Sequence, residues 1–234
     1  MTAFSSDFPD KFKFFSVKNA DDGDYDAMAA NFTAHLAKLG LDSCHEIIKV
    51  SGKSGLFRSD EFIEICYQKL NLVHQYLKDG FTVFLCDLDI VFLKNPIPYL
   101  LNKLEACDIA IQSDKARGRL YPARYAPIRG RKNTGFYMVK PTELTIDFFD
   151  VSEELTPWDG DPADQGYLNE KVRQKYDKYK DIECKILERD LFPFGKWWYE
   201  HHKNIPDPYI IHYNWIWFRE KKIERMKELS LIHI

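Results

Sequence analysis

Two aspartates, Asp87 and Asp89, follow directly on a strongly apolar short segment, Phe81 to Cys86. In an extended segment, side chains two residues apart point to the same side, so these two carboxylates should lie together. Close carboxylates repel each other unless a cation lies between them. Hard oxygen ligands of this kind suit Mn²⁺ or Mg²⁺. We therefore predict a divalent metal site at this pair, the alternative being two solvated turn residues.

The segments upstream of the pair indicate how it is positioned. They alternate between apolar runs, typical of strands, and helically spaced apolar residues that end near a glycine. We expect strands at residues 12–17, 46–50 and 81–86, and helices at residues 24–39 and 59–78. This order indicates an α/β domain with parallel strands. The two aspartates would then lie at the carboxyl end of a parallel strand, where open α/β sheets bind ligands.

The second half of the chain has a less regular pattern. We expect strands at residues 108–112, 135–139, 186–191 and 209–212, and helices at residues 145–154, 163–179 and 216–229. Residues 115–132 hold seven Lys or Arg and no acid, with glycines and prolines among them, which predicts a loop. Because we find no repeat and no clear linker, we expect the 234 residues to form one domain.

Composition excludes several classes of protein. The formal net charge of −3 argues against a general nucleic-acid-binding protein, because such proteins are usually basic. The five cysteines are odd in number and form no C-x-x-C pair, which favours buried free thiols over a disulfide framework or a zinc site. We recognise no signal peptide and no apolar run of membrane-spanning length. We therefore expect a soluble protein of a reducing compartment, such as the cytoplasm.

The aspartate pair also allows a second interpretation. Residues 87–91, DLDIV, fit the D-x-D-x-[TV] motif of phosphatases of the haloacid-dehalogenase superfamily. In those enzymes the first aspartate is a nucleophile and the second is a general acid. Their motif normally follows the strand that opens the fold, whereas here a whole strand–helix–strand–helix unit precedes it. The phosphatase is kept as an alternative, as is a non-catalytic module that binds a sugar or a nucleotide sugar.

Four further segments favour a transferase by their order along the chain. They are DLDIVFLKNP (87–96), NTGFYMVKP (133–141), DQGYLN (164–169) and IHYNW (211–215). Together they resemble the nucleotide-diphospho-sugar transferases of GT-A fold, particularly the retaining plant-wall xylosyl- and arabinosyltransferase-like group and the glycogenin-like group. The resemblance covers about residues 12–225. It implies one Rossmann-like domain with a mixed central sheet flanked by helices, divided into a nucleotide-binding half (about 12–112) and a half for the donor sugar and the acceptor (about 113–225).

The resemblance also implies roles for single residues. His212 would be the third protein ligand of a Mn²⁺ (or Mg²⁺) ion held by Asp87 and Asp89, and it follows an apolar segment that can place it at a strand end. Asp164 and Gln165 would lie beside the donor sugar as the catalytic pair. A lysine after His212 would contact the diphosphate, but Phe218 and Arg219 replace the usual glycine, so the lysine is either Lys221 or Lys222.

Two larger sets complete the predicted site. The remaining nucleotide-binding candidates are Lys18, Asn19, Tyr25, Lys69 and Leu88. The candidates for binding the donor sugar or the acceptor are Asn133, Thr134, Gly135, Asp114, Asn214, Trp197 and Trp198. For Lys69 an exposed helical lysine, and for the tryptophans a core position, are the alternatives.

The reaction that the resemblance implies is transfer of a hexosyl or pentosyl group from a nucleoside diphosphate sugar, with UDP as the expected nucleotide, to a hydroxyl of a glycan acceptor. The anomeric configuration would be retained. In the front-face mechanism proposed for such enzymes the departing phosphate takes the acceptor's proton, so no dedicated protein base is expected. Neither a nucleic acid nor a membrane is expected as a partner.

Overall fold

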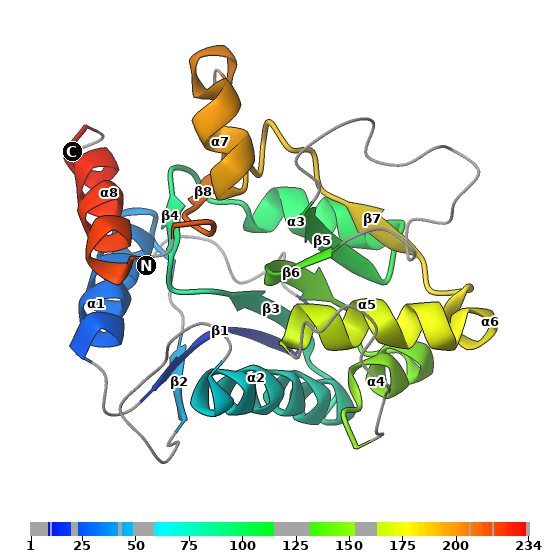
Figure 1. Cartoon of the computed structure of the whole chain (residues 1–234). Coiled ribbons are helices and arrows are strands. Elements are labelled where there is room, and N and C mark those ends of the chain that lie inside the picture. The colour runs from blue at the N-terminus through cyan, green and yellow to red at the C-terminus, as the bar shows by residue number, and fades with distance from the viewer. Residues whose placement is uncertain are drawn as a thin grey trace.

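The computed structural model describes residues 9, 11–19, 23–41, 44–48, 59–114, 132–152, 163–205, 207–216 and 218–232. A six-stranded sheet forms its centre (Figure 1), with the strand order β2-β1-β3-β6-β5-β7. The strands are β1 (Phe12–Asn19), β2 (Cys44–Ile48), β3 (Thr82–Cys86), β5 (Ile109–Ser113), β6 (Lys132–Val139) and β7 (Cys184–Ile186). A separate two-stranded sheet pairs β4 (Ile90–Phe92) with β8 (Ile210–His212).

The large sheet is mixed in direction. The strands β2, β1 and β3 run parallel to one another, as the alternating strands and helices of the first half predict. β6 pairs antiparallel with both β3 and β5, and β7 is again parallel to β5. β6 is therefore the one strand of these six that runs in the opposite direction.

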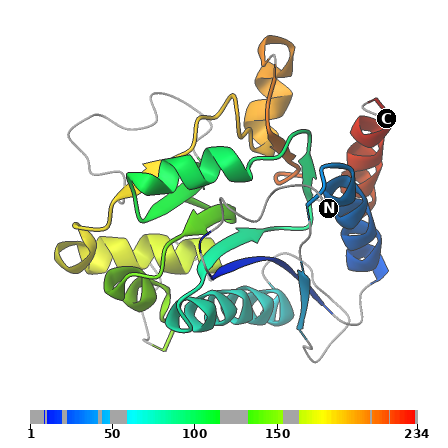
Figure 2. The same ribbon diagram turned by 180° about the vertical axis from the view of Figure 1, so that it is seen from behind.

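Helices cover both faces of this sheet (Figures 1 and 2). Alternate strand residues face opposite sides, so in β3 Val83 and Leu85 join one apolar cluster and Phe84 and Cys86 join the other. On the first side pack α2 (Asp60–Lys78), α4 (Glu143–Phe149), α5 (Asp164–Gln174) and α6 (Tyr176–Tyr179). On the second side lie α1 (Gly23–Lys38), α3 (Ile97–Glu105), α8 (Arg219–Ile232) and the small sheet.

The small sheet and α7 (Gly195–His201), followed by a 3₁₀ turn at His202–Asn204, form the part of the molecule beyond the carboxyl end of β3. α1 and α8, from the two ends of the chain, pack side by side next to β4. Among the described residues no helix is both long enough and apolar enough to cross a membrane. Cys66, Cys86, Cys107 and Cys184 are buried free thiols, as composition predicted.

Several predicted boundaries need correction. The strand expected at residues 186–191 is wrong, because β7 ends at Ile186 and its backbone pairs only with Ile109–Ile111 of β5. The helix expected at 145–154 is α4, which begins earlier because Thr142 and Thr145 form a reciprocal capping box. The single helix expected at 163–179 is two helices, α5 and α6. Elements that were not predicted at all are β4, α3 and α7.

The predicted basic loop at residues 115–132 lies outside the described residues except for Lys132, which is the first residue of β6.

Candidate functional site

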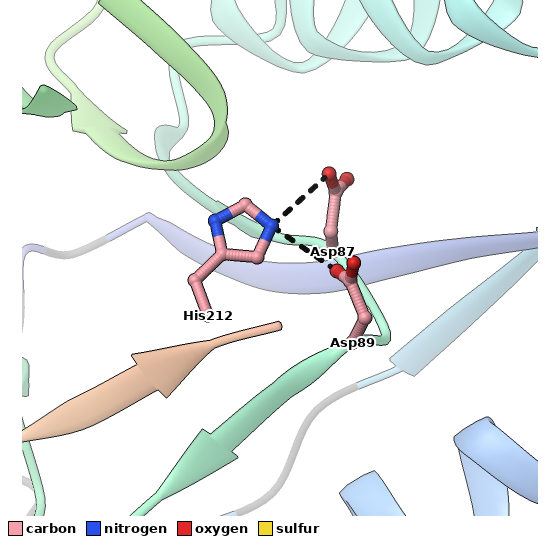
Figure 3. Close-up of side chains that lie close together, drawn as sticks. All are labelled: Asp87, Asp89 and His212. Atoms are coloured by element: carbon pink, nitrogen blue, oxygen red, sulfur yellow. Dashed lines mark ion pairs between the residues drawn. The ribbon is translucent and has the colours of Figure 1, made fainter. Parts of the chain in front are cut away.

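Three side chains, two from the segment between β3 and β4 and one from the end of β8, meet beyond the carboxyl end of β3 (Figure 3). His212, the last residue of β8, directs its Nε2 atom toward both aspartates. The distance from Nε2 to Asp89 Oδ1 is 3.2 Å, and that to Asp87 Oδ2 is 4.0 Å. One ligand atom from each of the three residues can be chosen so that all lie within 4.8 Å of one another. The structure therefore brings together the three residues predicted as metal ligands.

The backbone explains how the two aspartates converge. Asp87 directly follows β3, and its N–H donates to the Gly135 carbonyl at 2.7 Å. Leu88 and Asp89 form a turn rather than the extended segment that the sequence argument assumed, and β4 begins at the next residue. In β4, Ile90 pairs with His212 of β8, so the turn and the histidine are held in register.

The donor set suits a hard divalent ion. His212 Nε2 and Asp89 Oδ1 are both buried and make no hydrogen bond within the described part of the chain. Adjacent ligands of an octahedral ion with metal–ligand distances of 2.0–2.1 Å lie about 3 Å apart, close to the 3.2 Å between these two atoms. Two carboxylates and an imidazole are also ligands that Mn²⁺ accepts. The residues present therefore fit a metal, and the orphaned atoms are the ones that it would satisfy.

Lys69 of α2 forms a second, adjoining cluster beneath the aspartates. Its Nζ lies 3.1 Å from Asp87 Oδ1 and 2.5 Å from Asp164 Oδ2, and it donates to the Thr134 carbonyl at 3.4 Å. Burial lowers the pKa of the Lys69 ammonium, but Asp164 and Asp87 outweigh burial and raise that pKa well above its usual value. The lysine is therefore charged, and it partly neutralises Asp87 and Asp164. It is not the exposed helical lysine that was the alternative.

The two aspartates of the pair differ in their electrostatics. Burial would raise the pKa of the Asp89 carboxyl, but the Lys222 ammonium outweighs it and holds that pKa well below its usual range. The Lys222 ammonium donates to Asp89 Oδ2 at 2.7 Å. The pKa of Asp87 is raised, first by burial and then by Asp89, against the opposing charge of Lys69. Of the two candidate lysines after His212, Lys222 is thus the one at the site, while Lys221 is exposed and lies 5.9 Å from the Phe218 ring.

The predicted N-T-G segment forms an irregularity in the sheet. The register between β5 and β6 shifts from Ile111 opposite Tyr137 to Gln112 opposite Asn133, so the segment bulges out of the ladder. Gly135 lies so near the metal candidates that a Cβ built on it would come 2.4 Å from His212 Cε1 and 2.5 Å from Asp87 Oδ2. No side chain fits there without displacing those groups. The Asn133 side chain accepts from the Gly135 N–H at 2.9 Å.

The predicted catalytic pair begins α5. The helix N-cap is Ala163, not Asp164, and Asp164 is buried with its Oδ1 accepting from the Gln165 N–H. The Gln165 amide donates to Asp114 Oδ2 at 3.0 Å, which joins two residues predicted for the donor sugar. Lys69 contacts both Asp164 and Asp87 and so links these residues to the candidate metal ligands.

Aromatic residues of α7 lie farther along the same end of the molecule. The Trp197 ring stacks on His201 at a centroid distance of 3.7 Å and has the Arg189 guanidinium 4.0 Å from its centroid. An imidazole ring and a guanidinium group this close to the indole cannot lie on the same face of it. Both faces of the Trp197 ring are therefore covered by side chains of this chain. Trp198 is partly buried against the core. Asn214 accepts from the Gly195 N–H at 2.6 Å and so fixes the start of α7.

The remaining nucleotide-binding candidates are less tightly tied to this centre. Lys18, near the end of β1, pairs with Asp26 of α1. Leu88 is buried in the apolar core between the two aspartates. The side chains of Asn19 and Tyr25 lie outside what the structure describes.

One residue at the centre was not predicted. The Gln112 amide oxygen lies 2.7 Å from His212 Nδ1, although the two residues are 100 positions apart. The available signal was a glutamine ending the otherwise apolar run DIAIQ, but nothing in the sequence shows what a buried amide there would contact.

Comparisons with solved structures agree with this arrangement. A glycosyltransferase involved in glycosylation of the major capsid of PBCV-1 superposes with a TM-score of 0.55 at 13% identity, covering 92% of this chain and 99% of that one. The galactosyltransferase LgtC gives a TM-score of 0.55 at 13% identity, with coverages of 94% and 96%. At these identities the likeness establishes the fold, which is GT-A.

Sequence comparisons add relatives from Arabidopsis thaliana. The chain is 26% identical to the beta-arabinofuranosyltransferase RAY1 over 193 residues, 72% of this chain and 35% of that protein. It is 28% identical to the arabinosyltransferase XEG113 over 120 residues, 50% of this chain and 18% of that protein. The chain thus spans about a third of the first relative's length and about a fifth of the second's.

A family profile decides between the interpretations that the sequence left open. Residues 26–226 match the profile of the nucleotide-diphospho-sugar transferases, which is most of the chain. The match contradicts the phosphatase alternative, as does the position of the D-x-D after the third strand of the chain rather than the first. The chain belongs to the nucleotide-diphospho-sugar transferase family of glycosyltransferases.

Proposed function

We propose that this chain transfers a sugar from a UDP-sugar to a hydroxyl of a glycan acceptor, that the reaction depends on Mn²⁺ or Mg²⁺, and that it retains the anomeric configuration. The observation that carries the proposal is the facing pair of orphaned atoms, His212 Nε2 and Asp89 Oδ1, with Asp87 beside them. Two carboxylate oxygens and an imidazole nitrogen that converge beyond the carboxyl end of β3 suit an ion that binds a diphosphate.

The residues around this centre have separable roles in the proposal. Asp87, Asp89 and His212 would hold the ion, which when bound offsets negative charge on the departing diphosphate. Lys222, which pairs with Asp89, would contact the departing diphosphate. A preorganised positive charge at that position stabilises a leaving group without reorganising solvent.

The donor sugar would meet a different group of side chains. Asp114 and Gln165 are joined by a hydrogen bond, and Asp164 is anchored to Lys69. Hydrogen-bonding groups held this way can orient a sugar against the acceptor hydroxyl. In keeping with a front-face mechanism, we assign none of them as a general base.

The relatives guide the choice of donor to test first. One of them is named a beta-arabinofuranosyltransferase and another an arabinosyltransferase. We therefore propose a pentose, with UDP-arabinofuranose tested before UDP-arabinopyranose, UDP-xylose and UDP-hexoses. An oligosaccharide acceptor is included in each reaction because the proposed product is a glycoside.

The test measures binding and transfer separately. A ligand that binds only the folded state at 100 times its Kd adds about 2.7 kcal/mol to the free energy of unfolding, so melting temperatures of the wild type are recorded with UDP and each UDP-sugar, in Mn²⁺ and in EDTA. We expect an increase with Mn²⁺ that EDTA removes. Transfer is followed by mass spectrometry of the acceptor, and the anomeric configuration of the product by proton NMR.

Two variants and one control sharpen this test. Asp89→Asn removes a ligand charge, and Gly135→Ala pushes a methyl group against His212 and Asp87, so both should lose the Mn²⁺-dependent increase. Asp207→Asn is the matched control, since Asp207 is an exposed carboxylate paired with Lys94 away from the site. Equal nucleotide binding in Mn²⁺ and in EDTA would show that the metal proposal is wrong. A wild-type protein that binds UDP-sugars yet glycosylates no acceptor would be a binding module instead.

A further inference from the structure

Gln112 ends the apolar part of β5 and is completely buried. Strand alternation places it on the same side of the sheet as Ala110, the side that also carries Phe192 and Ile211. The register shift between Ile111 and Gln112 is a bulge, a device that re-aims a side chain next to a site. Gln112 thus reaches from the large sheet to β8 of the small sheet, which it joins through His212.

Only one orientation of the Gln112 side-chain amide is consistent with its hydrogen bonds. Its Nε2 donates to the Phe192 carbonyl at 3.0 Å. A backbone carbonyl can only accept, so the amide cannot be turned around. The amide oxygen must then face His212 Nδ1, at 2.7 Å. Because an amide oxygen also can only accept, Nδ1 must carry a proton.

The protonation of the other ring nitrogen, Nε2, follows from that of Nδ1. In a neutral imidazole with a proton on Nδ1, Nε2 has a lone pair and no hydrogen. That lone pair faces Asp89 Oδ1 at 3.2 Å, and neither atom makes a hydrogen bond. Two acceptors held this close repel each other unless a cation lies between them. The Phe192–Gln112–His212 chain therefore prepares a ligand atom and aims it at the carboxylates.

We infer that Gln112 is a positioning residue that selects the Nδ1–H tautomer of His212 and fixes its ring, and so sets the affinity of the site for a divalent ion. The inference rests on the proposed metal site. Partners of this kind, which orient a metal-binding histidine through its other nitrogen, typically change metal affinity about 10- to 100-fold when removed.

The backbone around the histidine supports the same role. The His212 N–H donates to the Pro193 carbonyl at 3.1 Å, and Phe194 bridges to His212 in parallel. The segment 192–194 therefore holds both the backbone of His212 and the amide of Gln112. Fixing the ring needs the side-chain contact as well, because the backbone contacts leave the imidazole free to turn about χ1 and χ2.

The first arm of the test uses the metal-free wild-type protein. Nitrogen-15 NMR of histidine-labelled protein distinguishes protonated from unprotonated ring nitrogens, and the His212 signals are those that vanish in His212→Gln. We expect protonated Nδ1 and unprotonated Nε2. A protonated Nε2 with unprotonated Nδ1 in the metal-free wild type overturns the inference without any variant of Gln112.

The second arm measures Mn²⁺ binding by electron paramagnetic resonance, with the metal alone as the probe. Gln112→Leu removes the acceptor, and we expect affinity to fall about 10- to 100-fold, with the Nδ1–H tautomer no longer dominant. Gln112→Glu keeps an oxygen opposite Nδ1 but loses the donor to the Phe192 carbonyl, so it should recover only part of the loss. Gln75→Leu, at an exposed glutamine of α2 that contacts Asp79, is the matched control and should bind like wild type.

The outcomes separate this inference from the proposed function. If wild type binds no Mn²⁺, the proposed metal site fails. If wild type binds Mn²⁺ and Gln112→Leu binds it equally well while folded, only the role of Gln112 fails. If Gln112→Leu does not fold, the nitrogen-15 spectrum of the metal-free wild type decides: a protonated Nδ1 with an unprotonated Nε2 supports the inference, and an unprotonated Nδ1 contradicts it.

Discussion

Among the residues that the structure describes, three lysines are buried, and they are held in different ways. Lys69 at the candidate site lies against the carboxylates of Asp87 and Asp164. Lys171 of α5, away from that site, donates to the backbone carbonyls of Asp147 and Asp150. Lys132, at the start of β6, has a pKa that burial lowers to about 8, with Cys184 acting in the opposite direction.

The difference in how these lysines are held explains why we assign Lys69 to the functional site. Burial alone lowers the pKa of a lysine because it penalises the charged form. At Lys69 the two carboxylates reverse that effect, so the site keeps a permanent cation among groups that the proposed chemistry needs to be anionic. Lys132 shows what burial does where carboxylates do not dominate. The three positions should therefore respond differently to the same substitution.

The largest effect is expected at Lys69. Lys69→Met leaves Asp164 buried and Asp87 partly buried without their cation, and removing one partner of a buried ion pair typically costs about 3–5 kcal/mol. The free energy of unfolding, measured by urea titration at pH 7 in EDTA, should fall by about that much. Lys103→Met is the control, because Lys103 pairs with Glu188 at the surface, where ion pairs contribute about 0–1 kcal/mol. A loss at Lys69 no larger than at Lys103 would mean that the cluster is solvated.

An intermediate loss is expected at Lys171. Its ammonium satisfies two carbonyls near the end of α4, the first at 2.8 Å. Hydrogen bonds to charged groups contribute roughly 1.5–3 kcal/mol, and Met can still fill most of the apolar space along the side chain. Urea titration of Lys171→Met should place it between Lys103→Met and Lys69→Met. A stability equal to wild type would show that water replaces the ammonium at these carbonyls.

Much of the fold could be predicted from the sequence because strands that are buried on both faces form continuous apolar runs. The run Phe81 to Cys86 predicted β3, and the D-x-D after it predicted the position of the site. α3 was missed because its residues, Ile97–Glu105, directly follow the D-x-D segment at 87–96 and were assigned to no element. The apolar residues after Ile186 predicted a longer strand, but the ladder between β7 and β5 ends at Ile186 and Ile111.

The inner contacts of the site were not readable in the same way. His212 could be assigned from motif order, but its link to Gln112 spans 100 positions and depends on the bulge. Lys69 occupies an ordinary helical position, and only the packing of α2 against α5 brings it to Asp164. Such contacts depend on where two elements cross, which side-chain periodicity does not encode.

The smallest effect, and the opposite sign, is expected at Lys132. Its folded-state pKa of about 8 lies below that of a lysine in an unfolded chain, about 10.4. At pH 7 both states carry the proton, so the net cost of burying this charge is present in the folded state. Between about pH 8 and 10.4 the unfolded state binds more protons than the folded state, so stability rises with pH.

Lys132→Met removes the cost of burying the charge and should melt higher than wild type at pH 7, by an amount that shrinks toward zero near pH 10.4. Lys38→Met, an exposed lysine of α1, is the control for added apolar character and should show no such pH dependence. If Lys132→Met melts lower than wild type at pH 7 and the difference does not change with pH, then interactions of the Lys132 ammonium outweigh its burial, and this lysine is held as Lys69 is.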